Sequence, residues 1–261
     1  MSRVRLTTEA VVLRAVPFRD ADLIVTLYTL ERGKVSAIAR GARKSRRRFG
    51  AGLGLFAVSE LELAGKARAE MWTIASCDLI RDFTRLGSDV GAMAHGSYGV
   101  ELVRELTVPD QADAAVFDLL VELFEVLLER GPAAEVLRGF ELHLLSHVGL
   151  APRLDRCVAC GDEPGSDVAL DGVRGGLTCA ACTSSPLPRA TTPLSSAALA
   201  LLIRAQRATS LAEMHPGAGA TATPGGAQAR DAMLAVLLAH IGKPLRSVEF
   251  IAKMSGAARK T

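Results

Sequence analysis

The chain has 261 residues and a net charge of +3, with 49% hydrophobic but only 4% aromatic residues. This length suits two modest domains, whose cores must be built mainly from Leu, Val and Ala. No apolar run is long enough to span a bilayer, and the first residues do not lead into a signal-peptide segment, which argues against membrane and secreted proteins. We therefore expect a protein of the reducing cytoplasm with no membrane partner.

The small net charge hides a strong segregation along the chain. Residues 1–81 carry a net charge of +7, residues 82–150 carry −8, residues 151–190 carry −1 and residues 191–261 carry +5. A basic domain followed by an acidic one predicts a polyanion-binding surface at one end. The same segments are the domains that we expect: a barrel, the first part of a helical domain, an inserted zinc ribbon, and the second part of the helical domain with a basic tail.

Residues 1–81 alternate between apolar and polar side chains and contain frequent turn signals. The expected strands are residues 10–16, 22–30, 34–40, 53–63 and 69–75. Five short strands in so short a stretch predict a small closed barrel rather than an open sheet. The OB-fold is the natural candidate, and it commonly binds single-stranded nucleic acid.

A basic loop, residues 40–49, lies between the third and fourth expected strands. The candidate DNA-binding residues are Lys34, Arg40, Arg43, Lys44, Arg46, Arg47, Arg48 and Phe49. The crowded cations repel one another unless an anion lies across them, and phosphates along a strand can do so while releasing counterions. The ring of Phe49 is a candidate stacking platform for a base, or it packs on the barrel. The alternative for the loop is a solvated segment with no ligand.

From residue 82 the apolar period becomes helical. The first expected helix has a stripe of Phe83, Leu86, Val90, Met93, Ser97 and Val100. Pro109 ends it, a second helix ends at Gly131, and a third runs to about Val148. These stripes are typical of a helical interior and contain no cofactor motif.

Four of the five cysteines form two C-x-x-C pairs. Cys157 and Cys160 are followed, after eighteen residues, by Cys179 and Cys182. This spacing is typical of a zinc module in which two knuckles complete a tetrahedron of thiolates. Because four sulfurs leave no open coordination position, we expect one structural Zn²⁺ rather than a catalytic one. Two disulfides, or thiols close by chance, are the alternative.

The residues around the cysteines support a ribbon. Gly161 allows the backbone to turn back over a metal, and strands at 168–170 and 173–178 are joined by an Asp-Gly hairpin signal. The fifth cysteine, Cys77, ends an apolar stretch and is expected to be a buried, inert thiol. Helices are expected at 194–207 and 228–241. The basic tail that follows either extends a nucleic-acid footprint or is a solvated end.

Short motifs spread over the chain resemble those of the bacterial RecO recombination and repair proteins. They are Arg40-Gly41-Ala42-Arg43-Lys44-Ser45, Tyr98 with Glu101-Leu102, Phe140-Glu141-Leu142-His143-Leu144-Leu145, Gly149-Leu150-Ala151-Pro152, Cys157-Val158-Ala159-Cys160-Gly161 and His240-Ile241-Gly242-Lys243-Pro244-Leu245-Arg246-Ser247. Each motif is weak alone, but the ordered set spans nearly the whole chain and is specific. The loop at residues 216–226 is particular to this sequence.

The resemblance implies an α+β protein with an N-terminal five-stranded OB-fold barrel and a helical domain carrying an inserted four-cysteine zinc ribbon. It also implies binding to single- and double-stranded DNA and annealing of complementary strands. With RecR, such proteins let RecA replace single-strand-binding protein on DNA gaps. The resemblance further implies contact with the acidic tail of single-strand-binding protein, and a cytoplasmic, nucleoid-associated bacterial protein with no small-molecule substrate.

A non-enzymatic DNA-binding mediator is the leading hypothesis. Its binding should be weakly sequence-specific and steeply salt-dependent, because the basic loop holds phosphates without reading base edges. The alternative is an interaction hub in which the ribbon and the acidic helices dock proteins and DNA contact is incidental. A zinc-dependent hydrolase or deaminase is disfavoured, because the four-sulfur site has no vacancy and no H-x-E companion precedes the cysteines.

Overall fold

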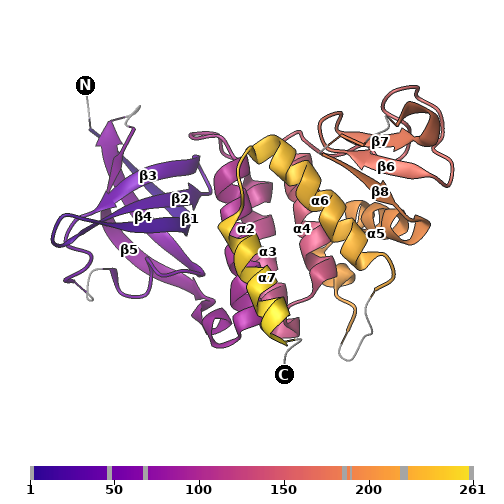
Figure 1. Ribbon diagram of the computed structural model, residues 1–261. Coiled ribbons are helices and arrows are strands. Elements are labelled where there is room, and N and C mark those ends of the chain that lie inside the picture. The colour runs from indigo at the N-terminus through magenta and orange to yellow at the C-terminus, as the bar shows by residue number, and fades with distance from the viewer. Residues whose placement is uncertain are drawn as a thin grey trace. The chain divides into compact units, whose positions relative to one another are not determined.

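Figure 1 shows the computed structural model, which describes residues 3–45, 49–66, 70–183, 187–188, 190–217 and 223–258. The chain divides into two compact units, Met1–Leu128 and Glu129–Thr261, called here the barrel unit and the helical unit. Their boundary lies inside a helix and well beyond residue 81, so the barrel unit includes helical residues as well as strands. Within the described residues, no helix is both long and apolar enough to cross a bilayer.

Five strands open the barrel unit: β1 (Arg3–Phe18), β2 (Asp22–Thr29), β3 (Gly33–Ala39), β4 (Ala57–Lys66) and β5 (Trp72–Asp82). Their order, β1-β2-β3-β5-β4, closes on itself because β1 also pairs with β4. The seam between β3 and β5 is a short parallel ladder, in which Ala37 pairs with Trp72 and Ile38 with Thr73. This is the five-stranded OB-like architecture that the strand pattern predicts.

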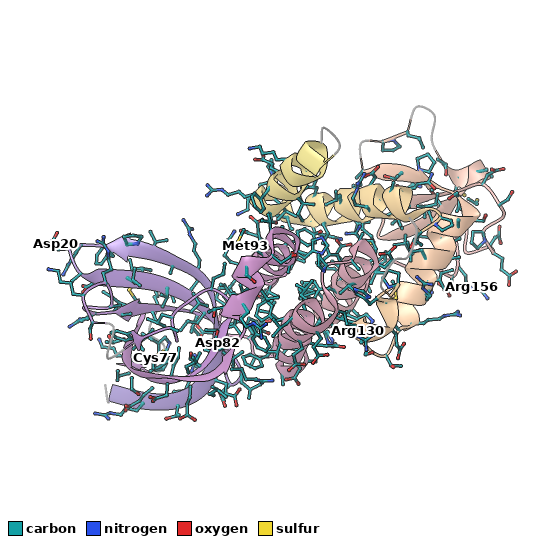
Figure 2. All side chains as sticks on the ribbon, turned by 90° about the horizontal axis from the view of Figure 1, so that it is seen from below. Asp20, Cys77, Asp82, Met93, Arg130 and Arg156 are labelled. Atoms are coloured by element: carbon teal, nitrogen blue, oxygen red, sulfur yellow. The ribbon has the colours of Figure 1, made fainter. Side chains whose placement is uncertain are left out.

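The alternation of apolar and polar side chains along each strand decides which of its two faces lies inside the barrel. In β3 the residues Val35, Ala37 and Ala39 are buried, whereas the residues between them are partly exposed. The interior is filled by a cluster that also contains Trp72 and Cys77. Cys77 is therefore the buried thiol that the sequence predicts (Figure 2), and burial raises its pKa.

Three strands, β1, β4 and β5, differ from the prediction in their boundaries. β1 starts at Arg3 rather than at residue 10, because its first half pairs with β4 from Arg3 opposite Lys66 onward. The expected turn around Gly65 lies inside β4, where Gly65 pairs with Val4. β4 begins at Ala57 and β5 at Trp72, both later than expected, and β5 runs on to Asp82.

The helical residues of the barrel unit are η1 (Thr84–Ser88), α2 (Val90–Leu106) and the start of α3 (Ala114–Arg130). The prediction of one continuous helix from residue 82 is wrong. Asp89 begins α2, since its side chain accepts a hydrogen bond from the Ala92 amide, and this break shifts the helical register. Val90 is therefore 43% exposed instead of lying on the buried stripe.

The helical unit contains α4 (Ala134–His147), α5 (Ser196–Arg207), η3 (Leu211–Met214), α6 (Gly226–Ile241) and α7 (Arg246–Ala258). Its sheet has the order β7-β6-β8, with β6 (Val168–Asp171), β7 (Gly176–Cys179) and β8 (Thr191–Leu194), and η2 (Ala180–Cys182) follows β7. Both β8 and α7 were missed. Residues 246–258, where the sequence predicts an irregular basic tail, form the helix α7. Residues 191–194 form β8 at the edge of the sheet, a position that tolerates Pro193.

The hairpin between β6 and β7 also differs from the prediction of a two-residue Asp-Gly turn. Asp171 pairs with Gly176, which leaves four residues in the connection. The Asp171 carboxylate accepts the backbone amides of Val173 and Arg174. Gly172 packs against α6, where a Cβ atom would lie 2.9 Å from the Cα atom of Val236. The glycine is needed for helix contact rather than for the turn itself.

Candidate nucleic-acid interface and metal centre

The described part of the basic loop, residues 40–45, folds back against the turn between β1 and β2. The Gly41 amide donates to Asp22 Oδ1 at 2.8 Å, and the Arg43 amide donates to the Ala21 carbonyl at 2.9 Å. A further 3.4 Å contact joins an Arg43 guanidinium nitrogen to the carbonyl of Asp20, which lies at the outer end of the barrel (Figure 2). These bonds fix the backbone at the start of the loop.

The cations of this part of the loop point into solvent. Arg40, Arg43 and Lys44 are exposed, and among the described residues none of the three forms an ion pair with a carboxylate. The nearby carboxylate of Asp22 instead accepts the Gly41 amide. Three uncompensated cations on a fixed backbone favour an anionic ligand. Arg46, Arg47 and Arg48 lie outside the described residues, so their predicted role stays a prediction.

Lys34 has a local partner in the barrel unit. Its ammonium donates to the Arg104 carbonyl at 2.6 Å, at the C-terminal end of α2. A cation at this position satisfies a helix carbonyl and complements the helix dipole. Contact between Lys34 and DNA stays a prediction, and it would compete with this bond.

Phe49 packs inside the barrel rather than standing at its surface. Its side chain is 3% exposed and belongs to the barrel core. Of the two alternatives, the structure shows packing on the barrel, whereas contact of Phe49 with DNA stays a prediction that would require the ring to leave the core. The ring packs there because residues 49–56 fold onto β4 and β5, with the Ser59 hydroxyl donating to the Gly52 carbonyl at 2.8 Å.

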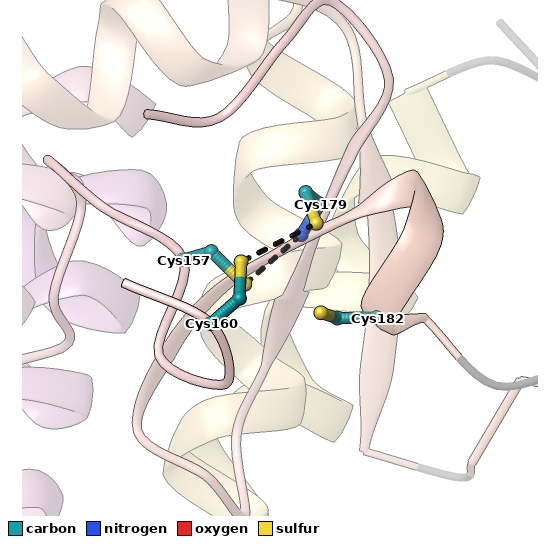
Figure 3. A group of neighbouring side chains, drawn as sticks. All are labelled: Cys157, Cys160, Cys179 and Cys182. Carbon is teal, nitrogen blue, oxygen red and sulfur yellow. Dashed lines mark hydrogen bonds between the residues drawn. The ribbon is translucent and has the colours of Figure 1, made fainter. Parts of the chain in front are cut away.

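The four cysteines of the two C-x-x-C pairs converge in the helical unit. Cys157 and Cys160 come from one turn, Cys179 ends β7, and Cys182 ends η2 (Figure 3). Their sulfur atoms all lie within 4.8 Å of one another, and the sulfurs of Cys160 and Cys179 are 3.9 Å apart. A zinc ion with thiolates at about 2.3 Å has sulfur–sulfur edges of roughly 3.8 Å, so the arrangement fits one tetrahedral metal.

The backbone around the cysteines holds this geometry. The Val158 amide donates to the Leu177 carbonyl at 2.8 Å, which ties the first knuckle to β7. Gly161 has a φ of +81° and its amide donates to the Cys157 carbonyl, as the sequence predicts for a turn over a metal. All five cysteines are free, so the disulfide alternative is not observed.

Cys157 is the best prepared metal ligand. It is fully buried, and the Cys179 amide points at its sulfur at 3.4 Å. The backbone amides of Cys160, Cys179 and Ala159 lower the pKa of Cys157 to about 6. The thiolate is the form that binds a metal, so these amides favour ligation at neutral pH. Within the described residues, the cysteines are the one group of His, Cys, Asp or Glu side chains close enough to hold an ion.

Sequence reasoning missed Asp22 and the β1–β2 turn as parts of the interface. Asp22 stands eighteen positions before Arg40, and only the antiparallel pairing of β2 with β3 brings the two ends together. A carboxylate at the start of a strand was a weak signal, because it is equally common on any solvated surface.

Comparisons with known proteins agree with this architecture. The family model described as "Recombination protein O N terminal" matches residues 1–83, and "Recombination protein O C terminal" matches residues 87–249. Their junction lies at the end of β5, close to the domain boundary that the charge pattern predicts, whereas the compact units divide within α3.

Relatives match over almost their full length. A "DNA repair protein RecO" of Anaeromyxobacter sp. (strain K) is 41% identical over 253 residues, covering 96% of each chain. Proteins of the same description from Geobacter sulfurreducens and Myxococcus xanthus are 36% and 33% identical, covering 95% and 96% of this chain and 97% and 98% of their own. The chain belongs to the RecO family of DNA repair proteins.

Proposed function

We propose that this protein acts in recombinational repair by binding single- and double-stranded DNA and annealing complementary strands. It works as a non-enzymatic mediator: with RecR it helps RecA load onto DNA that is coated by single-strand-binding protein. Family membership supports this role, and the observation that carries it is the fixed, uncompensated cationic edge of an OB-like barrel. The protein acts in the bacterial cytoplasm, associated with the nucleoid through its DNA.

The physical basis of annealing is charge neutralisation. Arg40, Arg43 and Lys44 hold phosphates without reading base edges, so either strand of any sequence can bind. Partial neutralisation lowers the repulsion between two approaching strands. We assign this task to residues 1–81.

The cysteine module, defined as residues 157–183, holds one structural Zn²⁺ in this proposal. Four sulfurs from two knuckles fit the ion and fill its coordination sphere, which leaves no position for an activated water. The zinc then keeps the module folded, and the module is a scaffold rather than a catalyst. No small-molecule substrate is needed for such a role.

Salt titration of DNA binding tests the cationic edge. Replacing Arg43 and Lys44 with Ala should reduce the slope of log affinity against log salt for single strands by roughly 1.4, because about 0.7 counterion is lost per phosphate contact. A matched control replaces Arg204 and Arg207, two exposed cations on α5, and should leave the slope unchanged. An unchanged slope in the Arg43 and Lys44 variant, with the fold intact, would remove the loop from the site.

Annealing distinguishes a mediator from an interaction hub. Complementary fluorescent strands coated with single-strand-binding protein should anneal faster when this protein is present, and RecA should displace the coat only when RecR is added as well. The Arg43 and Lys44 variant should lose annealing while it still captures RecR. Full annealing by that variant would favour the hub, in which DNA contact is incidental.

A further inference from the structure

The outward face of β2 and β3 is the part of an OB-like barrel where ligands commonly lie. Directly opposed residues of paired strands project to the same face. Val25 and Ala37 are opposed, point inward and are fully buried. The outward positions alternate with them, and they differ from one end of the sheet to the other.

One end of this face is covered by the barrel unit itself. Tyr28 and Lys34 are opposed on the outward side, and Tyr28 is only 1% exposed. The Tyr28 hydroxyl donates to the Asp113 carbonyl at 3.2 Å, and the Asp110 amide donates to the Lys34 carbonyl at 3.0 Å. The chain that follows α2 therefore covers the face around Tyr28, and less of this end is open to a ligand.

The other end of the face remains open and carries an apolar row. Val16 is opposed to Ile24, and Ile24 is opposed to Ile38, so the three side chains lie side by side across β1, β2 and β3. Val16 is 37% exposed, and Ile24 and Ile38 are partly exposed. Exposed positions of a half-buried antiparallel sheet are normally polar, so three aliphatic residues in register indicate a ligand with an apolar surface.

Phe18 extends the apolar row toward the β1–β2 turn. It lies opposite Asp22 and is only partly buried, unlike the core ring of Phe49. The Arg19 guanidinium lies 5.1 Å from the centroid of the Phe18 ring. Phe18, rather than Phe49, is therefore the aromatic side chain near the basic loop that is at the surface.

Cations border the apolar row and Phe18. Arg14 is exposed two positions before Val16, Arg19 follows Phe18, and Arg40 follows the end of β3. The anchored part of the basic loop adds Arg43 and Lys44 beside the same turn. An apolar strip with cations along its border complements a ligand with flat apolar faces on a polyanionic backbone, which is the chemistry of single-stranded DNA.

We propose that Phe18 and the row of Val16, Ile24 and Ile38 contact the bases of single-stranded DNA while the bordering cations hold its phosphates. This inference rests on the proposed DNA-binding function and adds to it a determinant of strand preference. A duplex keeps its bases stacked inside, so it meets the cations alone. The apolar row therefore makes single strands the preferred ligand of this face.

Fluorescence gives a direct test with a Phe18→Trp variant. The native chain has one tryptophan, Trp72, which is 1% exposed inside the barrel and provides a constant background. Oligo(dT) should quench the new indole by stacking on it, whereas a duplex of the same length should bind without quenching it. No quenching at saturating oligo(dT) would overturn the proposal.

Affinity measurements with Phe18→Ala complete the test. Single-strand affinity should fall about 5- to 150-fold, the range for loss of one base–aromatic stack. Duplex affinity and the salt slope should stay unchanged because the cations remain. Ile38→Thr keeps a β-branched side chain and should weaken single-strand binding to a smaller degree. Leu79→Ala, which truncates another exposed apolar residue of the barrel (43% exposed), is the matched control and should have no effect.

The two variant sets separate this inference from the proposed function. If the Arg43 and Lys44 variant loses binding while Phe18→Ala binds both DNA forms normally, the DNA-binding function stands and the base-contact inference is overturned. Equal loss of single-strand and duplex binding in Phe18→Ala would also overturn it, because the ring would then support the cations rather than select single strands. A protein that binds no DNA at low salt overturns both.

Discussion

The barrel and the cysteine module reach their structures by different routes. The barrel buries a continuous core of aliphatic and aromatic side chains, and its strands pair around a closed circuit. The cysteine module offers one short two-stranded ladder and a few buried side chains such as Leu170 and Leu177. Such a small core does little to offset the entropy of ordering its residues, and in the proposed function a bound metal ion supplies the remaining stability.

This difference assigns the two regions different tasks. In the barrel the core supplies the stability, and the surface carries cations such as Arg40, Arg43 and Lys44, to which we assign the binding of DNA phosphates. In the module the four sulfur atoms lie together at the centre of the fold, so they are not available to bind a ligand outside it. Substitutions that affect one region and leave the other intact test this difference.

The largest effect is expected for Cys157→Ser. Structural zinc contributes on the order of 10 kcal/mol to folding of small metal modules, and loss of the buried ligand removes most of it. Bound zinc should fall from one ion per chain toward none, and amide protons of residues 168–183 should exchange freely. The barrel amides should keep their protection, because their core is independent of the metal.

Cys77→Ser is the matched control for this experiment. It also replaces a buried cysteine, but one in the barrel core beside Ser59. This variant should keep its zinc and lose only barrel stability. Retention of zinc by Cys157→Ser, or loss of barrel protection in that variant, would contradict the separation of the two regions.

The sequence predicts best where short-range signals decide the structure. β2 and β3 are found to within one residue, because alternation and the turn at Gly33 define them locally. The cysteine cluster is also predicted from short-range signals, because two C-x-x-C knuckles with this spacing can meet in few ways. The end of α3 at Arg130 follows from the Gly131-Pro132 signal, and α4 ends at His147, within one residue of the predicted end.

The remaining features depend on pairing between distant residues. β1 is twice as long as expected because β4, about sixty residues away, supplies a partner for its first half. Phe49 is buried because residues 49–56 fold onto β4 and β5, a contact between distant residues that no local pattern reveals. In α7 the charges of Arg246 and Lys253 hide an apolar face formed by Val248 and Ile251, which is why the sequence favours a tail there.

The barrel unit should lose stability at alkaline pH because of Tyr28. Burial, with a smaller contribution from the Asp113 carboxylate, raises the pKa of Tyr28 from 10.0 to about 12. The stability due to the neutral phenol is fully present below pH 10 and is lost as pH rises toward 12, because the unfolded chain ionises first. Tyr28→Phe should remove this loss of roughly 2 kcal/mol, as measured by denaturant unfolding across that pH range.

At neutral pH the same variant should destabilise the barrel unit and leave the cysteine module unchanged. It removes the hydrogen bond to the Asp113 carbonyl and should cost the barrel unit about 1 kcal/mol. Zinc content and exchange of the module amides should stay unchanged. An alkaline midpoint that does not move in Tyr28→Phe would show that another group controls unfolding there.

The smallest effect is expected at Asp22, whose carboxylate both anchors the basic loop and opposes its charge. Asp22→Asn keeps an oxygen for the Gly41 amide but removes the negative charge, so single-strand affinity should rise about 2-fold, in line with exposed charge pairs. Asp22→Ala removes the acceptor as well. The loop start then loses its anchor, and the affinity should fall below that of the Asn variant by up to about 5-fold, the equivalent of one hydrogen bond of about 1 kcal/mol. Equal affinities for the two variants, measured by anisotropy at one salt concentration, would mean that DNA binds the loop regardless of how its backbone is held.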